Sequence, residues 1–196
     1  MHLITRFLVL FSCVLLLSCA YASASEDAVK VFVDGVNESS NALMKDGPGE
    51  PARERTRALL ASSFDVPWMA KYTLGKAWET ASPEKQAELL AAFEEEAISG
   101  YLRRMGEPGT RLSFVGQRPP LNGDQVAASK RVTPGKEDET WIWRMRPDGG
   151  AFRIVDVIVD GFSALNSTLN DYGSVWGSSN GNVDAVIAFM RKRAAQ

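Results

Sequence analysis

The stretch TWIWRMRPDGGAFRIVDVIV, residues 140–159, decides the fold of this chain. Its first half places Trp141, Trp143 and Met145 on one side of an extended backbone, which is the two-residue period of a β-strand. The turn sequence PDGG then reverses the chain. Residues 152–159 are largely apolar on both sides, so the second strand is covered on both faces or borders an interior space. The stretch therefore predicts an antiparallel hairpin.

Two further strands are expected before this hairpin. Apolar and polar residues alternate over 112–116. Asn122-Gly123 is a favourable turn ahead of another extended segment, Gln125 to Thr133. Four successive strands joined by short connections predict an antiparallel meander.

The first half of the chain has the period of helices instead. Apolar residues recur at steps of three and four over 29–43 and, in a broad stripe, over 89–105. The second of these helices begins at Ser82-Pro83, a capping residue followed by a proline at the first helical position. One more helix is expected from about Val183 to Arg193. Helices followed by an antiparallel sheet place the chain in the α+β class, with the helical half packed on the four-stranded sheet.

The residues best suited to nucleophilic catalysis or zinc binding are confined to the start of the chain. His2 is the only histidine, and Cys13 and Cys19 are the only cysteines. Without these residues the rest of the chain has no imidazole and no thiol, which excludes Ser-His-Asp, Cys-His and Cys/His zinc sites and leaves carboxylates as the only plausible acid–base groups. The three successive carboxylates at 94–96 cannot converge on one helix face, so we expect them to face solvent. We therefore predict no catalytic residues, no metal site and no cofactor.

The same early segment has the layout of a secretory signal peptide. A single basic residue, Arg6, precedes an apolar run over 7–17 that is too short to span a bilayer, and two A-x-A patterns follow. We therefore predict a cleavable signal peptide over 1–24 and a mature domain over 25–196. Two alternatives stay open: the run is a buried helix, or Cys19 is lipidated within the poor lipoprotein box LLSC.

Four separated segments carry a resemblance to a known family. They read FDVPWMA at 64–70, LGKAW at 74–78, IVDVIVDGFS at 154–163 and GNVDAVI at 181–187. Between them lie SPE at 82–84, Phe93 and Tyr101. In this order they resemble the MlaC family of periplasmic phospholipid-binding proteins, also known as toluene-tolerance auxiliary components of an ABC transporter. The resemblance covers nearly the whole mature chain.

The resemblance implies an NTF2-like α+β cone whose helices and sheet enclose an apolar cavity for acyl chains. Such proteins are periplasmic lipid carriers, not enzymes. They shuttle phospholipid between an outer-membrane lipoprotein complex and an inner-membrane ABC transporter complex, so these are the expected partners. Exposing an acyl chain costs about 0.8 kcal/mol per methylene, or roughly 11 kcal/mol for fourteen methylenes, so a carrier must enclose its chains. A formal net charge of −2 without a basic stripe sets nucleic acid aside as a partner.

One departure from the family pattern bears on the ligand. Family members commonly carry an arginine a few residues after the serine that is Ser163 here, where this chain has NSTL at 166–169. A related branch, HpnM, is associated with hopanoid biosynthesis. A hopanoid-type polycyclic lipid therefore stays an alternative ligand.

The expected lipid-binding residues are large apolar side chains from both the helical half and the sheet. They are Phe64, Met69, Leu74, Trp78, Phe93, Tyr101, Trp141, Trp143, Ile154, Val157, Val159 and Phe162. Taken from composition alone, the tryptophans are better explained as plain core. Asp156, Gly161 and Ser163 are expected to be structural, with Asp156 accepting hydrogen bonds from the turn after its strand.

Two other classes of function stay open. NTF2-like cones also host isomerases and dehydratases in which an aspartate in an apolar cavity is the general base, and Asp156 or Asp160 is the candidate here. The absence of a histidine beyond His2 and of an evident oxyanion donor counts against an enzyme. A protein-interaction module that binds no lipid is the other alternative.

Overall fold

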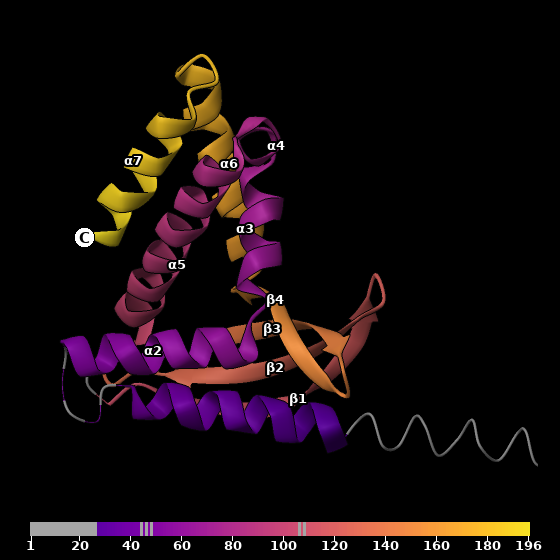
Figure 1. Ribbon diagram of the computed structural model, residues 1–196. Helices are drawn as coiled ribbons and strands as arrows, with labels where there is room; N and C mark the ends of the chain where they lie inside the picture. Colours follow the sequence, from indigo (N-terminus) through magenta and orange to yellow (C-terminus); the bar gives the residue numbers. More distant parts are fainter. Residues whose placement is uncertain (1–26, 44, 46, 48, 106, 108) are drawn as a thin grey trace, which may run out of the picture.

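An antiparallel sheet forms the base of the structure, and most of the helices stand above it (Figure 1). The structure is a computed structural model that describes residues 27–43, 45, 47, 49–105, 107 and 109–196. The predicted signal peptide, residues 1–24, lies outside the described residues. Helical residues 27–42 and α2 run roughly along the strands, whereas α3, α5, α6 and α7 rise from the base (Figure 1).

The sheet follows the predicted meander and adds one short strand. Its strands, in spatial as well as sequence order, are β1 (Arg111–Leu121), β2 (Asp124–Val132), β3 (Glu139–Asp148), β4 (Ala151–Val159) and β5 (Phe162–Ser163). The fifth strand was not predicted. It forms because Asp160 and Gly161 both have positive φ, at 49° and 87°, so the chain reverses within two residues and pairs with the end of β4. Strand β1 is longer than expected and includes two prolines, which an edge strand tolerates.

The hairpin of β3 and β4 has the predicted alternation. Trp141 pairs with Val159 and Trp143 pairs with Val157 across the two strands. Both tryptophans and Met145 are buried on the face that meets the helices. Strand β4 is buried on both faces near its middle, where Ile154, Val155 and Asp156 follow one another, as its largely apolar sequence indicated.

The helices have the following bounds. They are residues 27–42, α2 (Glu50–Ser63), α3 (Val66–Leu74), α4 (Lys76–Thr80), α5 (Pro83–Met105), α6 (Ala164–Ser178) and α7 (Val183–Ala194). The expected cap of α5 is present, since the Ser82 hydroxyl accepts a hydrogen bond from the backbone N–H of Lys85 at 3.3 Å. The helical and strand parts confirm the α+β class.

The sequence predicts a single helix after the sheet, but the structure has two, α6 and α7. The sequence of α6, ALNSTLNDYGSVWGS, is rich in serine, asparagine and glycine, and only Leu165 and Tyr172 within it are buried. The helix is stabilised at its start instead. The Ser163 hydroxyl accepts a hydrogen bond from the N–H of Asn166 at 3.0 Å, which caps the first turn.

Asp156 connects this cap to the sheet. One oxygen of its buried carboxylate accepts a hydrogen bond from the Ser163 hydroxyl at 2.7 Å, and the other accepts one from the N–H of Leu165 at 3.0 Å. Both donors belong to the first turn of α6 or to its cap. The carboxylate therefore fixes where α6 begins, and the helix packs against β4 from that point.

We expect the substitution Asp156→Asn to lower the free energy of unfolding by about 1–3 kcal/mol, because one of the two acceptor oxygens becomes an NH2 donor. Urea unfolding of the purified protein measures this loss. Asp138→Asn is the control: Asp138 pairs with Lys130 on the surface, so its loss should stay below about 1 kcal/mol. Equal losses in the two variants would contradict the role given to Asp156.

Candidate functional site

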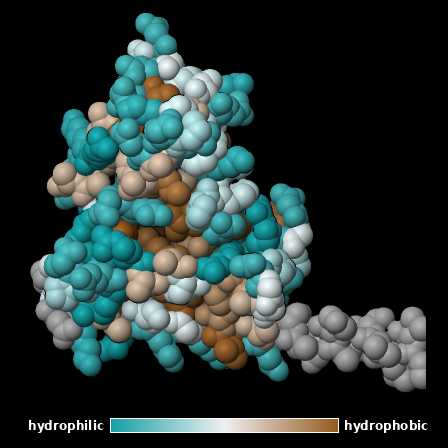
Figure 2. Space-filling model, in the orientation of Figure 1, coloured by the Kyte–Doolittle hydropathy of each residue, from teal (hydrophilic) through white to brown (hydrophobic). Residues whose placement is uncertain are grey.

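A cavity of about 740 Å³ lies between the helices that rise from the sheet and the β3–β4 hairpin. Its walls come from α2, α3, α5, α6, β3, β4 and β5, and a residue of α7 closes one side. Apolar surface is visible in a recess between the helices and the base, surrounded by hydrophilic surface (Figure 2). The site is therefore an apolar chamber that opens to solvent through a polar rim.

The structure brings together eight of the apolar residues named from the sequence. They are Phe64, Met69, Phe93, Tyr101, Trp141, Val157, Val159 and Phe162. Four others lie outside the wall. Leu74 and Ile154 are buried in the core, and Trp78 packs against that core from the short helix α4. Trp143 is fully buried, and its indole N–H donates to the Ser129 hydroxyl at 2.8 Å.

A chain of aromatic contacts stiffens the inner wall. The rings of Phe64 and Tyr101 lie 5.9 Å apart and nearly perpendicular, and those of Tyr101 and Trp141 are 6.2 Å apart in the same arrangement. The Tyr101 hydroxyl shares a hydrogen bond of 2.7 Å with the Ser40 hydroxyl. Burial raises the pKa of Tyr101, so the phenol stays neutral.

Small residues on α5 leave room for the chamber. Ala97 and Gly100 line it between the larger side chains of Phe93 and Tyr101, on one face of the helix. These two residues were not identified from the sequence, and neither were Leu60, Val66, Thr73, Leu165 and Tyr172. The available signal was the gap in side-chain volume at Ala97 and Gly100 within an otherwise large apolar stripe.

A buried polar cluster forms one side of the chamber. Glu96 accepts a hydrogen bond from the Tyr172 hydroxyl at 2.8 Å and pairs with the Arg193 guanidinium at 2.7 Å. The prediction that residues 94–96 all face solvent was wrong for Glu96, which is 6% exposed. Successive helix residues point about 100° apart, so one member of the run faces inward. Burial raises the pKa of Glu96, and the Tyr172 hydrogen bond and the Arg193 charge oppose that shift.

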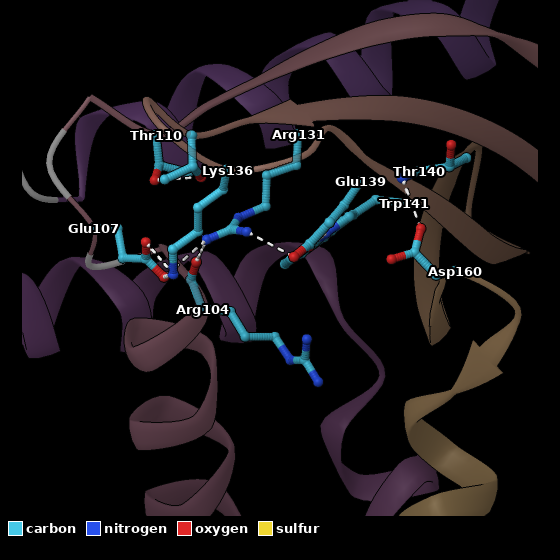
Figure 3. A network of polar contacts seen from close by, with 10 residues as sticks. Arg104, Glu107, Thr110, Arg131, Lys136, Glu139, Thr140, Trp141 and Asp160 are labelled. Carbon is cyan, nitrogen blue, oxygen red and sulfur yellow. Dashed lines mark hydrogen bonds and ion pairs between the residues drawn. The ribbon is translucent and has the colours of Figure 1, made fainter.

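A second polar cluster ties the end of α5 to the sheet (Figure 3). Arg131 on β2 is 5% exposed; its guanidinium donates to the backbone carbonyl of Arg104 and pairs with Glu139 at 3.0 Å. Glu107 lies 3.7 Å from the same guanidinium and 2.7 Å from the Lys136 ammonium. The Lys136 ammonium holds the pKa of Glu107 below its usual range. This cluster sets the position of Arg104 beside the chamber.

A smaller cavity of about 610 Å³ shares a wall with the chamber. Leu60, Phe64 and Val66 line both spaces, so the two cavities adjoin at these three side chains. The outer lining of the smaller cavity includes Arg57 and Arg153 and is more polar than the chamber. Of these two cavities, the chamber has the larger volume and the aromatic wall.

Two further features of the described residues bear on the chemistry. They contain no group of three or more histidine, cysteine or carboxylate side chains placed to hold a metal ion. Every helix in the described ranges is too short or too polar to cross a bilayer. The carboxylate of Asp156 is not part of the chamber lining, whereas Asp160 is, with one oxygen accepting the Thr140 N–H at 3.2 Å.

We expect Glu96 to make the stability of the fold depend on pH. Its pKa in the folded state lies above the ordinary glutamate value of about 4.3, so the folded protein binds this proton more tightly than the unfolded chain does. Its contribution to stability is therefore present at low pH and lost as the pH rises through the raised pKa. Denaturant unfolding at pH values from about 4 upward should show Glu96→Gln becoming more stable relative to the wild type as pH increases. A constant difference between the two proteins would contradict this.

Comparison with known proteins agrees with this architecture. The family profile described as MlaC protein matches residues 27–192. Among solved structures, the phospholipid-binding protein from Ralstonia solanacearum, in complex with a phospholipid, superposes with a TM-score of 0.69 at 19% sequence identity. The alignment covers 85% of this chain and 97% of that one, which shows a shared fold. No curated protein matches the chain. Because the family match includes both the helices and the sheet, this chain belongs to the MlaC family.

Proposed function

We propose that this protein is a periplasmic lipid carrier that encloses the acyl chains of a phospholipid in the large chamber. The observation that carries the proposal is the chamber itself, a space of about 740 Å³ with an aromatic inner wall in a chain of the MlaC family. The Ralstonia protein with the same fold was solved with a phospholipid bound, which supports the same class of ligand here.

The physical demand on such a carrier is to remove acyl chains from water. Each buried methylene is stabilised by about 0.8 kcal/mol, so the chains favour the apolar depth beside Phe64, Phe93 and Trp141. The headgroup needs no such protection and can remain at the rim. A carrier of this kind also needs no reactive side chain.

The proposal extends to the route of the lipid. A carrier exported by its signal peptide would exchange phospholipid with an outer-membrane lipoprotein complex and an inner-membrane ABC transporter complex. The basis for these partners is membership of the MlaC family. A hopanoid-type polycyclic lipid is the alternative cargo, because an apolar chamber of this volume accepts fused rings as well as chains.

An enzymatic role for the aspartates is less well supported. Both oxygens of Asp156 accept hydrogen bonds at the start of α6, and the residue does not line the chamber. Asp160 does line the chamber, but one of its carboxylate oxygens already accepts a hydrogen bond from the backbone N–H of Thr140. Neither arrangement presents a free base to an apolar interior, so the geometry favours binding over proton transfer.

Organic extraction of the purified protein followed by mass spectrometry tests the proposal. We expect bound phospholipid in the wild type and several-fold less in Ala97→Phe, because the new ring occupies the chamber. The ring fills empty space, so the free energy of unfolding should change by less than about 1 kcal/mol. Ala91→Phe is the matched control, since Ala91 lies exposed on the same helix and outside the chamber lining. Equal lipid in the two variants would contradict the chamber as the binding site.

N-terminal sequencing of the exported protein tests the predicted localisation. Cleavage after one of the two A-x-A patterns should leave a chain that begins at Ser23 or Ser25. A product that begins at an acylated Cys19 would instead make the protein a membrane-tethered one.

A further inference from the structure

We propose that Arg104, assisted by Arg103, binds the phosphate of the lipid headgroup at the rim of the chamber. This inference rests on the proposed function and specifies it further. It commits the cargo to a lipid that carries a phosphate anion, as opposed to an uncharged polycyclic lipid. Most of the other charged groups around the rim are already paired within the protein.

Arg104 lies at the rim and has no anionic partner among the described residues. It belongs to the last turn of α5, lines the chamber and is exposed. Its backbone carbonyl is held by Arg131, while its own guanidinium points away from that cluster (Figure 3). Within the described part of the chain, no carboxylate lies within ion-pair distance of it. The residue is therefore anchored through its backbone and free to bind through its side chain.

The other charges around the chamber are engaged. Glu139 pairs with Arg131, and Asp160 accepts the Thr140 N–H. Arg193 pairs with both Glu96 and Asp171, so these three groups satisfy one another. A ligand anion at the rim would therefore meet Arg104 without first displacing a protein carboxylate from it.

Arg103 is the second cation at this position. Its guanidinium donates one hydrogen bond to the backbone carbonyl of Arg193 at 3.2 Å, and no ion pair involves it among the described residues. An arginine has five N–H donors, so most remain available for phosphate oxygens. The two arginines are adjacent at the end of α5, and both line the chamber.

The position of Arg104 along α5, beyond the apolar residues of the chamber wall, suits a lipid whose phosphate lies at the rim. Phe93, Ala97, Tyr101 and Arg104 follow one another on the chamber side of the helix. From Phe93 to Arg104 the helix rises by about 16 Å, which is the scale of an acyl chain. A phosphate held by Arg104 would leave the chains beside the apolar part of this face.

The test measures which lipid the protein removes from a mixed membrane. Vesicles contain equal amounts of phosphatidylglycerol and of diacylglycerol with identical acyl chains, so the two lipids differ only in the phosphate headgroup. After incubation the protein is separated from the vesicles, and both lipids bound to it are quantified by mass spectrometry. Because both lipids come from the same vesicle, attraction of the protein to the charged surface affects them equally.

We expect the wild type to favour phosphatidylglycerol and Arg104→Gln to lower that preference by about three- to tenfold, the range for a partly exposed charge-assisted contact. Arg104→Lys keeps the charge and should retain most of the preference. Arginine and glutamine have similar helix propensity, so Arg104→Gln should fold normally. Arg111→Gln is the control: it removes the same charge from an exposed position on β1 outside the chamber.

The outcomes separate this inference from the proposed function. If the wild type and Arg104→Gln bind lipid with the same preference, the phosphate subsite is wrong while the lipid carrier stands. The same holds if Arg111→Gln lowers the preference as much as Arg104→Gln does. If inorganic phosphate binds to the wild type and not to Arg104→Gln while the wild type shows no preference between the two lipids, the site takes the free anion and not the headgroup, and the inference is again overturned. If the protein removes neither lipid, the proposed function fails and the inference fails with it.

Discussion

The structure depends on keeping an apolar space open inside a small domain. A folded interior is normally close-packed, so the residues around an open chamber lose contacts that core residues usually have. Here the side chains of the chamber wall are held in place by contacts with their neighbours in the same wall. Tyr101 meets Phe64 and Trp141 edge to face and is fixed by Ser40, while Phe93 meets Tyr172 on the other side. Such contacts resist collapse because each ring is held by neighbours in the wall and not by atoms across the space.

Buried polar groups provide the second part of this support. Asp156 fixes the start of α6, Glu96 joins α5 to α6 and α7 through Tyr172 and Arg193, and Arg131 joins the end of α5 to the sheet. Each is a costly group to bury, and each is compensated by specific partners. Directional bonds of this kind specify the relative position of elements more narrowly than apolar packing does. They therefore hold the helices at a fixed distance from the sheet. Apolar contacts alone would draw the helices onto the sheet and close the chamber.

Local patterns predicted the elements that are regular over many residues. One such pattern is the alternation of apolar and polar residues through Trp141 and Trp143, and another is the capped apolar stripe of α5. Each of these patterns lies entirely within one strand or one helix. Helix α6 escaped prediction because its polar, glycine-containing sequence has little intrinsic helicity. It is stabilised by Ser163, Asp156 and contacts with α3, all of which lie outside its own residues. Glu96 escaped for a related reason, since its partners are 76 and 97 positions away in the sequence.

The sequence by itself determined the α+β class, the meander, the cap and extent of α5 and the resemblance to the MlaC family, because each depends on periodicity or on short contiguous motifs. Only the tertiary structure decided which large apolar residues face the chamber. Trp141 and Trp143 lie two residues apart on the same strand face, yet the first lines the chamber and the second is sealed in the core against Ser129. The physical reason is that the strand period selects only a face of the sheet, whereas contacts between distant residues decide what covers each position on that face. Ser129, which accepts the hydrogen bond from Trp143, is also hydrogen-bonded to Asn37 in the helical residues 27–42.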